Sequence, residues 1–218
     1  MRSKSFLASM LAYVKSCFCI AADQYGDREG QYGDGFDEDE SPLAAESDAT
    51  ATQRLRDEPA DEPAMDLLEL CVNGDVDAAR LLLDNGAEVD RANQNGATPL
   101  HIACCTGHVD LARLLLDNGA EVNRAMKDAT PLLIACYNGH VEAARLLLEK
   151  GAEVDRAMED GTTPLFIACQ NGHVDAALLL LDKGADVNRA NGWKLTPLSI
   201  AKSKGHSSIV ALLEEHQK

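Results

Sequence analysis

A tripeptide, Thr-Pro-Leu, recurs along this chain at an almost constant period. It begins at Thr98, Thr130, Thr163 and Thr196, with steps of 32, 33 and 33 residues. A Gly-His pair stands nine residues after each threonine, beginning at Gly107, Gly139, Gly172 and Gly205. A fixed period in the thirties predicts a solenoid, because a unit this short cannot bury its own apolar surface and must stack on its neighbours.

Each repeated unit carries start and stop signals for two short helices. The Thr98 hydroxyl can accept a backbone N–H of the first turn, and Pro99 at the first helical position gives up no hydrogen bond. Gly107 and Gly119 stand where two helical runs must stop, because glycine adopts a left-handed backbone without steric cost. The unit therefore reads as helix, turn, helix and a hairpin-like loop.

The second helix of each unit has one polar stripe. Asp110, Arg113 and Asp117 are spaced at i, i+3 and i+7, and the other positions are mostly Leu, Val or Ala, so we expect only this stripe to face water. The same stripe recurs as Asp77, Arg80 and Asp84, and as Glu142, Arg145 and Glu149. Leu178 takes the arginine position of the fourth unit, where it could extend an apolar contact patch.

The segment Thr98–Ala103, read as Thr-Pro-Leu-His-x-Ala at period 33, resembles the ankyrin repeat. The resemblance covers residues 65–218 and implies an all-α solenoid of five stacked repeats, each a helix-turn-helix with a hairpin loop. The repeats are expected at residues 65–92, 93–125, 126–157, 158–190 and 191–218.

Three repeats depart from the pattern. The first has no Thr-Pro-Leu, and Asp66 and Glu69 predict the polar outer face of a capping unit. The last has Lys202 near a core position, which is tolerated if no further unit covers that side. The third is one residue short, since Met126–Ala129 stands where the preceding unit has Asn93–Ala97. Its loop lacks the turn glycine, so we expect a tighter or displaced finger.

Composition narrows the function classes. The chain has 218 residues, with 36 acidic and 20 basic side chains and a formal charge of −16, which argues against nucleic-acid binding. We find no apolar run of about 18 residues, the length that a spanning helix needs. The seven cysteines are an odd number, which argues mildly against a secreted disulfide framework.

Residues 1–22 form a distinct basic and apolar segment, whose only charges are Arg2, Lys4 and Lys15. A secretory signal, a transit peptide and an interfacial helix with lipidated Cys17 and Cys19 all fit parts of it. A frayed terminus with an incidental apolar stripe is the plain alternative. Its apolar residues have the spacing of one helical face: Phe6, Leu7, Met10, Leu11, Val14 and Phe18.

Residues 23–64 are rich in Gly, Pro and acid, with eight carboxylates between Asp23 and Glu40 against the single Arg28. Such a segment buries too little apolar surface to offset its ordering entropy, so we expect a disordered acidic linker.

Cysteine and histidine also recur with the repeat. Cys71, Cys104, Cys136 and Cys169 form a ladder. Stacked helices lie about 8–10 Å apart, too far for four sulfurs to share one zinc ion or for two to form a disulfide, so we expect small apolar core residues. The histidines His108, His140, His173 and His206 follow a glycine in every unit, which predicts a structural role in hydrogen bonding between units.

His101 appears in one unit only, near Cys105, which turns to another helical face where we expect it to be exposed. A Cys–His nucleophile is one interpretation. The resemblance implies instead that His101 caps its own helix through the Thr98 hydroxyl. No phosphate loop, metal-binding helix or nucleophile elbow is present, so we expect neither cofactor nor catalysis.

The resemblance places a protein-binding surface on the loop fingertips and the exposed face of each first helix. Tyr137 and Trp193 are the aromatic residues there, the kind enriched in interface hot spots, although Trp193 could instead pack on its own loop. The predicted partner-binding residues are Gln94, Asn95, Cys105, Thr106, Lys127, Asp128, Tyr137, Asn138, Glu159, Asp160, Gln170, Asn171 and Trp193.

The resulting functional hypothesis is a monomeric, cytoplasmic, non-catalytic scaffold that binds another protein. The alternative is a membrane-tethered or organelle-imported adaptor, addressed by residues 1–22.

Overall fold

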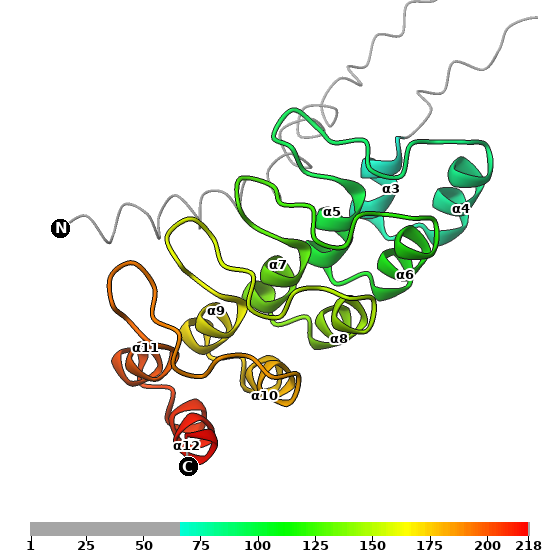
Figure 1. Cartoon of the computed structure of the whole chain (residues 1–218). Helices are drawn as coiled ribbons and strands as arrows, with labels where there is room; N and C mark the ends of the chain where they lie inside the picture. The colour runs from blue at the N-terminus through cyan, green and yellow to red at the C-terminus, as the bar shows by residue number, and fades with distance from the viewer. Residues whose placement is uncertain (1–65, 218) are drawn as a thin grey trace, which may run out of the picture.

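The computed structural model describes residues 66–217, which fold into ten helices arranged as five consecutive pairs (Figure 1). The predictions made for residues 1–22 and 23–64 lie outside the described residues. Within residues 66–217 the fold is entirely helical apart from its loops, as predicted.

The first and second helices of the pairs form two separate layers, each helix contacting the equivalent helix of the next pair. The inner layer consists of α3 (Leu67–Asn73), α5 (Pro99–Thr106), α7 (Pro131–Asn138), α9 (Pro164–Asn171) and α11 (Pro197–Lys204). The outer layer consists of α4 (Val76–Asp84), α6 (Val109–Asp117), α8 (Val141–Glu149), α10 (Val174–Asp182) and α12 (Ser207–His216).

The inner helices begin and end where the sequence signals them. Thr130 has an extended backbone, and its hydroxyl oxygen accepts the Leu133 N–H at 3.2 Å, while Pro131 opens α7. Gly139 ends α7 at φ +75°, and its N–H donates to the Ala135 carbonyl. In α3 the Asp66 carboxylate caps the helix in place of threonine, accepting the Glu69 N–H at 2.9 Å.

The histidine ladder joins neighbouring repeats. In three of its four members the ring Nε2 donates to a backbone carbonyl in the last turn of the preceding inner helix. These bonds run from His140 to Cys105 (3.1 Å), from His173 to Tyr137 (3.0 Å) and from His206 to Gln170 (3.1 Å). The same ring also lies against the helix-ending glycine of the preceding repeat. A Cβ on Gly139, for example, would lie 2.6 Å from the His173 Nδ1. The predicted structural role is confirmed, and it explains why Gly and His recur together.

A second ladder, which the sequence reasoning missed, joins the loops after the outer helices. A side-chain oxygen of one repeat accepts a backbone N–H of the next. These bonds run from Glu121 to Asp90 (3.0 Å), from Glu153 to Asn123 (3.0 Å) and from Asp186 to Asp155 (3.1 Å). Its acceptors recur at steps of 33 and 32 residues, the same period that revealed the other ladders.

The core runs the length of the stack between the two layers and consists mainly of Leu, Ala, Ile and Cys. The four ladder cysteines are fully buried and unpaired, as predicted. Burial raises the pKa of the Cys71, Cys136 and Cys169 thiols to about 12 and raises that of Cys104 as well. These thiols are therefore neutral core groups at physiological pH.

The outer helices expose the predicted polar stripe. In α6, Asp110, Arg113 and Asp117 face solvent, while Leu111 and Leu115 are buried. This confirms the reading of the second helix as amphipathic.

The two ends of the stack differ from each other. Asp66 of the first repeat is exposed and Glu69 is half-buried, in keeping with the predicted polar face, but the same repeat also has Leu81 62% exposed, because no preceding repeat covers it within the described residues. Its equivalent in the next repeat, Leu114, is 7% exposed. At the other end of the described stack Lys202 is exposed and pairs with Glu214 at 2.8 Å.

Candidate functional site

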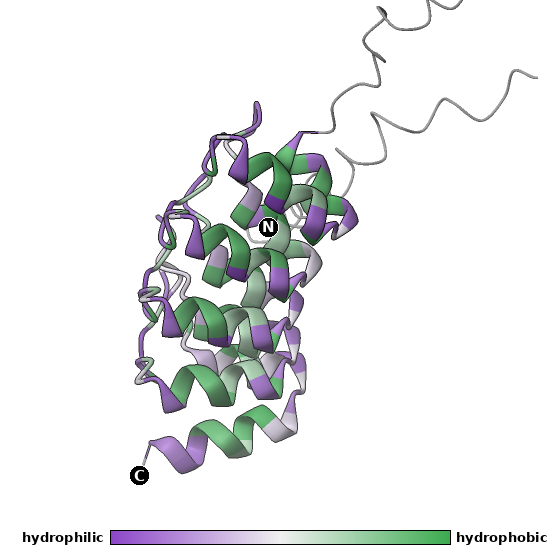
Figure 2. Cartoon of the chain, turned by 90° about the vertical axis from the view of Figure 1, so that its right-hand side faces the viewer, coloured by the Kyte–Doolittle hydropathy of each residue, from purple (hydrophilic) through white to green (hydrophobic). Residues whose placement is uncertain are grey.

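Four hairpin fingers link each outer helix to the next inner helix and line up along one edge of the stack (Figures 1 and 2). In three of them the first residue donates its N–H to the carbonyl four positions on. These bonds run from Asn93 to Ala97 (2.9 Å), from Met158 to Thr162 (3.0 Å) and from Asn191 to Leu195 (3.0 Å). The residue before each closing position has a left-handed backbone: Gly96, Gly161 and, without glycine, Lys194 at φ +61°.

Asparagine side chains stabilise the first and last of these fingers. The Asn93 Oδ1 accepts the N–H groups of Asn95 and Ala97, each at 3.0 Å. The Asn191 Oδ1 does the same for Trp193 and Leu195, each at 3.1 Å. Each asparagine thereby ties the tip of its finger to its base.

The finger of the third repeat is tighter, as its missing residue predicts. Met126 and Ala129 exchange both backbone hydrogen bonds, at 2.9 and 3.0 Å, around the two-residue turn of Lys127 and Asp128. Both turn residues have positive φ, 44° and 70°, the signature of the type I′ turn that suits a two-residue hairpin. The side chain of Met126, at the base of this finger, is buried.

The last two fingers are joined through their backbones. The Gly192 N–H donates to the Asp160 carbonyl at 2.7 Å. A Cβ on Gly161 would lie 3.1 Å from the Asn191 Cα, so the two fingers approach closely at this point. This contact holds the finger of Trp193 in a defined position relative to its neighbour.

The fingertips carry the most exposed of the predicted site residues. Trp193 is 49% exposed, and its neighbour Leu195 is 39% exposed. Asn95 and Asp160 are half-buried and take part in the hydrogen bonds of their fingers. The Asn95 N–H donates to the Asn93 Oδ1, and the Asp160 Oδ1 accepts the Thr162 N–H. The other exposed predicted residues are Gln94, Lys127, Asp128 and Glu159.

The predicted residues on the inner helices are half-buried and engaged in the fold. The Asn171 side chain donates to the Tyr137 carbonyl of the preceding repeat at 2.8 Å. Asn138 donates to the Ile134 carbonyl at 3.0 Å, and the Thr106 hydroxyl donates to its own helix. Of this group, Tyr137 keeps its side chain partly accessible, and burial raises the pKa of its phenol.

Two predicted site residues are buried, which corrects the expectation that they face a partner. Cys105 is 8% exposed, because Asn138 of the next repeat covers it, with the amide nitrogen 3.8 Å from the Sγ. Gln170 is 9% exposed within the inner layer, where its carbonyl accepts the His206 Nε2 proton. A single sequence cannot show this covering, because it comes from the neighbouring unit.

His101 lies in the core at 1% exposure and caps α5, as the resemblance implied. Its Nδ1 lies 2.7 Å from the Thr98 Oγ1 and accepts the Thr98 N–H at 3.3 Å, which assigns the ring proton to Nε2. Burial lowers the pKa of His101 to about 4, although the nearby carbonyls of Ala129 and Arg124 oppose the shift. The ring is therefore neutral.

Neither His101 nor Cys105 has the ionisation that a nucleophilic pair needs. A reactive cysteine has a lowered pKa, whereas burial raises that of Cys105 despite the hydrogen bond from Asn138. Within residues 66–217 we find no group of three or more His, Cys, Asp or Glu residues arranged to hold a metal ion. In the same part of the chain, no helix has the length and apolar character needed to cross a membrane.

Comparison with known families agrees with this geometry. The family described as "Ankyrin repeats (3 copies)" matches residues 44–126 and 125–191, and "Ankyrin repeats (many copies)" matches residues 172–214. No curated protein matches the chain. Ankyrin repeats are in general protein–protein interaction modules. Because the matches together span residues 44–214, well over half of the sequence, the chain belongs to the ankyrin repeat family.

Proposed function

We propose that this protein is a non-catalytic scaffold that binds another protein along its row of fingertips. One observation carries the proposal: the four fingers are ordered by internal hydrogen bonds, while their tips remain exposed. Backbone hydrogen bonds within each finger fix its shape, while tip side chains such as Gln94, Lys127 and Trp193 are exposed.

The mechanism is rigid presentation. Association normally loses free energy when loops and side chains become ordered, at about 0.5–1.5 kcal/mol for each immobilised side chain. Here the Asn93 and Asn191 bonds already fix two fingers, and the Gly192–Asp160 bond fixes two fingers to each other. A partner therefore meets a surface whose backbone needs little further ordering.

Trp193 is the proposed anchor of the interface. It is the only tryptophan of the chain, is half exposed and stands on the finger that is tied to its neighbour. Leu195 lies beside it and adds exposed apolar surface. Large aromatic side chains with apolar neighbours are the residues that most often dominate binding energy.

The remaining fingertips are polar and of mixed charge. Lys127 and Asp128 form the tip of the tight finger, and Glu159 lies at the tip of the next. Charged groups of both signs favour a partner with a patterned polar surface and set its orientation more than its affinity. Cys105 and Gln170 have no part in this surface, because they are buried.

The test uses the full chain as bait in affinity capture, followed by titration with the recovered partner. Trp193→Ala is expected to weaken binding at least about tenfold, and Tyr137→Ala by a smaller factor, in line with hot-spot truncations of about 1–2 kcal/mol. Leu81→Ala, which also truncates an exposed apolar side chain but on α4, is the matched control and should bind normally. Unchanged affinity in both aromatic variants, with helical circular dichroism preserved, would remove the proposed site.

A cytoplasmic, monomeric scaffold is the form we favour. The alternative, an adaptor carried to a membrane or organelle, rests on residues 1–22, which combine basic charge with an apolar stripe. Fusing residues 1–22 to a fluorescent reporter distinguishes the two, because a diffuse signal would argue against any address in this segment.

A further inference from the structure

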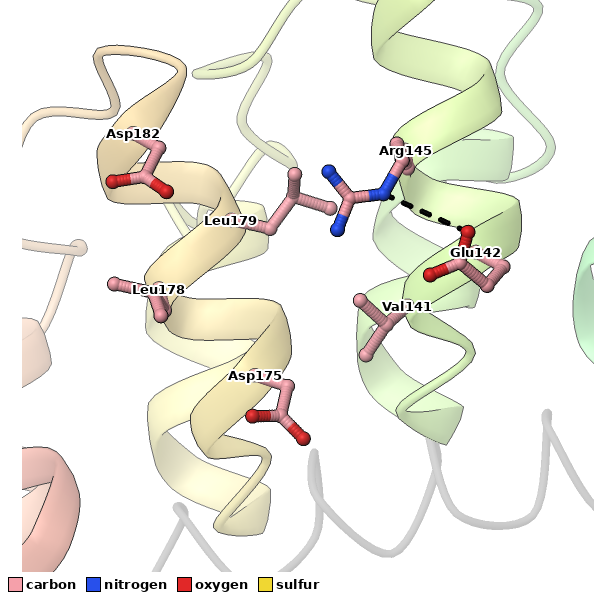
Figure 3. Close-up of a pocket in the computed structure, with 7 residues that line it drawn as sticks. All are labelled: Val141, Glu142, Arg145, Asp175, Leu178, Leu179 and Asp182. Carbon is pink, nitrogen blue, oxygen red and sulfur yellow. Dashed lines mark ion pairs between the residues drawn. The ribbon is translucent and has the colours of Figure 1, made fainter.

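A groove lies between the outer-layer helices α8 and α10, and all of its lining residues belong to these two helices (Figure 3). Its volume is about 320 Å³. Val141, Glu142 and Arg145 line it from α8, and Asp175 and Leu178 are among the side chains that line it from α10. None of these residues belongs to the fingertip surface.

The groove owes its character to the substitution of one leucine for arginine. Position 178 corresponds to Arg80, Arg113 and Arg145 of the other outer helices, and Leu178 is 40% exposed. Val174, one turn earlier on α10, is 37% exposed. Valine also stands at this position in α6 and α8, so it is Leu178 that extends the apolar surface into a strip where the neighbouring repeats carry arginine.

Leu178 also offers no cation to the two carboxylates that flank it. In α8 Arg145 lies 3.6 Å from Glu142, forming an ion pair within the helix. In α10 Asp175 and Asp182 flank Leu178, and neither forms an ion pair within the described residues. The outer face of α10 is therefore acidic, apolar and again acidic along two helical turns. Across the groove, α8 contributes Arg145, whose charge is paired with Glu142.

The chain carries a segment with the complementary pattern. Residues 1–22 have Arg2 and Lys4 at one end, apolar residues from Phe6 to Val14, and then Lys15, with no acidic residue. This order is basic, apolar, basic. Opposite charges at both ends of an apolar contact define the register and direction in which two segments fit together.

The tether is long enough for this contact. Residues 23–65 contain 43 positions, which allow a reach of up to about 140 Å when extended. Between α4 and α10 there are three helix-to-helix steps of about 8–10 Å each, or roughly 30 Å. A segment held on the same chain also binds at an effective concentration that is commonly about millimolar, so even a weak contact is populated.

We propose that residues 1–22 dock in the outer groove between α8 and α10 of their own chain. The apolar strip of Val174 and Leu178 takes the apolar face of the segment, while Asp175 and Asp182 take its basic ends. Docking hides the apolar face of residues 1–22 from membranes and other proteins. Residues 1–22 thus act as an intramolecular ligand of the outer layer, and this binding does not involve the fingertip surface.

A spin label on the full chain tests the contact directly. In a Cys19→Ser chain, Cys17 takes a nitroxide selectively, because the five described cysteines are buried. The amide signals of α8 and α10 should then lose most of their intensity, whereas those of α4 should keep theirs. No broadening in α8 and α10, or broadening centred on α4 or on the fingers, overturns the proposal.

Three variants of the labelled chain identify the cause. Leu178→Arg restores the residue found in the other outer helices, so the fold should persist while the broadening disappears. Reversing the basic charges of the segment, with Arg2→Glu, Lys4→Glu and Lys15→Glu, should abolish it as well. Leu81→Arg places the same new charge on the exposed leucine of α4 and should leave the broadening intact. Broadening that survives Leu178→Arg, or is lost with Leu81→Arg, refutes docking at this groove.

Discussion

Lowering the pH from 7 to 5 is expected to destabilise this fold by about 2 kcal/mol through the imidazole of His101 alone. Burial lowers the pKa of this group to about 4, against an ordinary value of 6.5. Between pH 6.5 and pH 4 the His101 imidazole is therefore mostly protonated in the unfolded chain but mostly neutral in the folded chain. The stabilisation is complete above pH 6.5 and is lost as the pH falls toward 4, where the total loss approaches about 3 kcal/mol.

Structure explains why the folded state resists the proton. The ring is 1% exposed, and its Nδ1 already accepts the Thr98 N–H at 3.3 Å. Protonation would turn that acceptor into a donor facing a donor, inside a core with few compensating charges. The carbonyls of Ala129 and Arg124 near the ring soften the effect without reversing it.

The assay is urea unfolding at pH 7 and at pH 5, followed by circular dichroism, for the parent chain and for His101→Leu. Leucine is the natural residue at the equivalent position, Leu133, where it is fully buried, so the variant should fold. Removal of the Thr98 contact shifts its stability equally at both pH values and cancels in the comparison. The parent should lose about 2 kcal/mol more than the variant over this range. Equal losses in the two proteins would refute the reasoning.

Two further substitutions test backbone features of the stack. Gly139→Ala should cost about 1–2 kcal/mol more than Gly205→Ala, since both glycines have positive φ but only Gly139 lies beneath a histidine ring, which an added Cβ would displace from its hydrogen bond. Equal destabilisation of the two in thermal unfolding would mean that the His173 contact contributes nothing. Lys194→Gly should stabilise the chain by about 0.5–1 kcal/mol, because its left-handed backbone is the one that Gly161 supplies in the preceding finger. A lower midpoint in the same assay would contradict this.

The repeated architecture could be predicted because its signals are local and recur four times. Thr130 and Pro131 begin a helix, and Gly139 ends it, for reasons contained in those residues and their immediate neighbours. The short third finger also followed from one missing residue, because a two-residue hairpin has few allowed conformations. The left-handed backbone of Lys194 could not be predicted in this way, since the surrounding turn imposes it and lysine has no preference for it.

The binding surface was less predictable because burial depends on the adjacent repeat. Cys105 and Gln170 occupy positions that look exposed on an isolated helix pair, yet stacking covers both. Leu81 shows the opposite effect, since it is exposed whereas its equivalents Leu114, Leu146 and Leu179, each covered by a preceding repeat, are buried. Leu178 could be recognised as a departure from the repeat, but the groove beside it depends on the spacing of α8 and α10.

Hydrogen exchange measured by mass spectrometry on the full chain, alone and with its captured partner, tests the central claim most directly. The account predicts that binding slows exchange in the fingers at residues 93–97, 126–129, 158–162 and 191–195, with little change in α4, α6 and α12. Slowed exchange in those outer helices with unchanged fingers would contradict it.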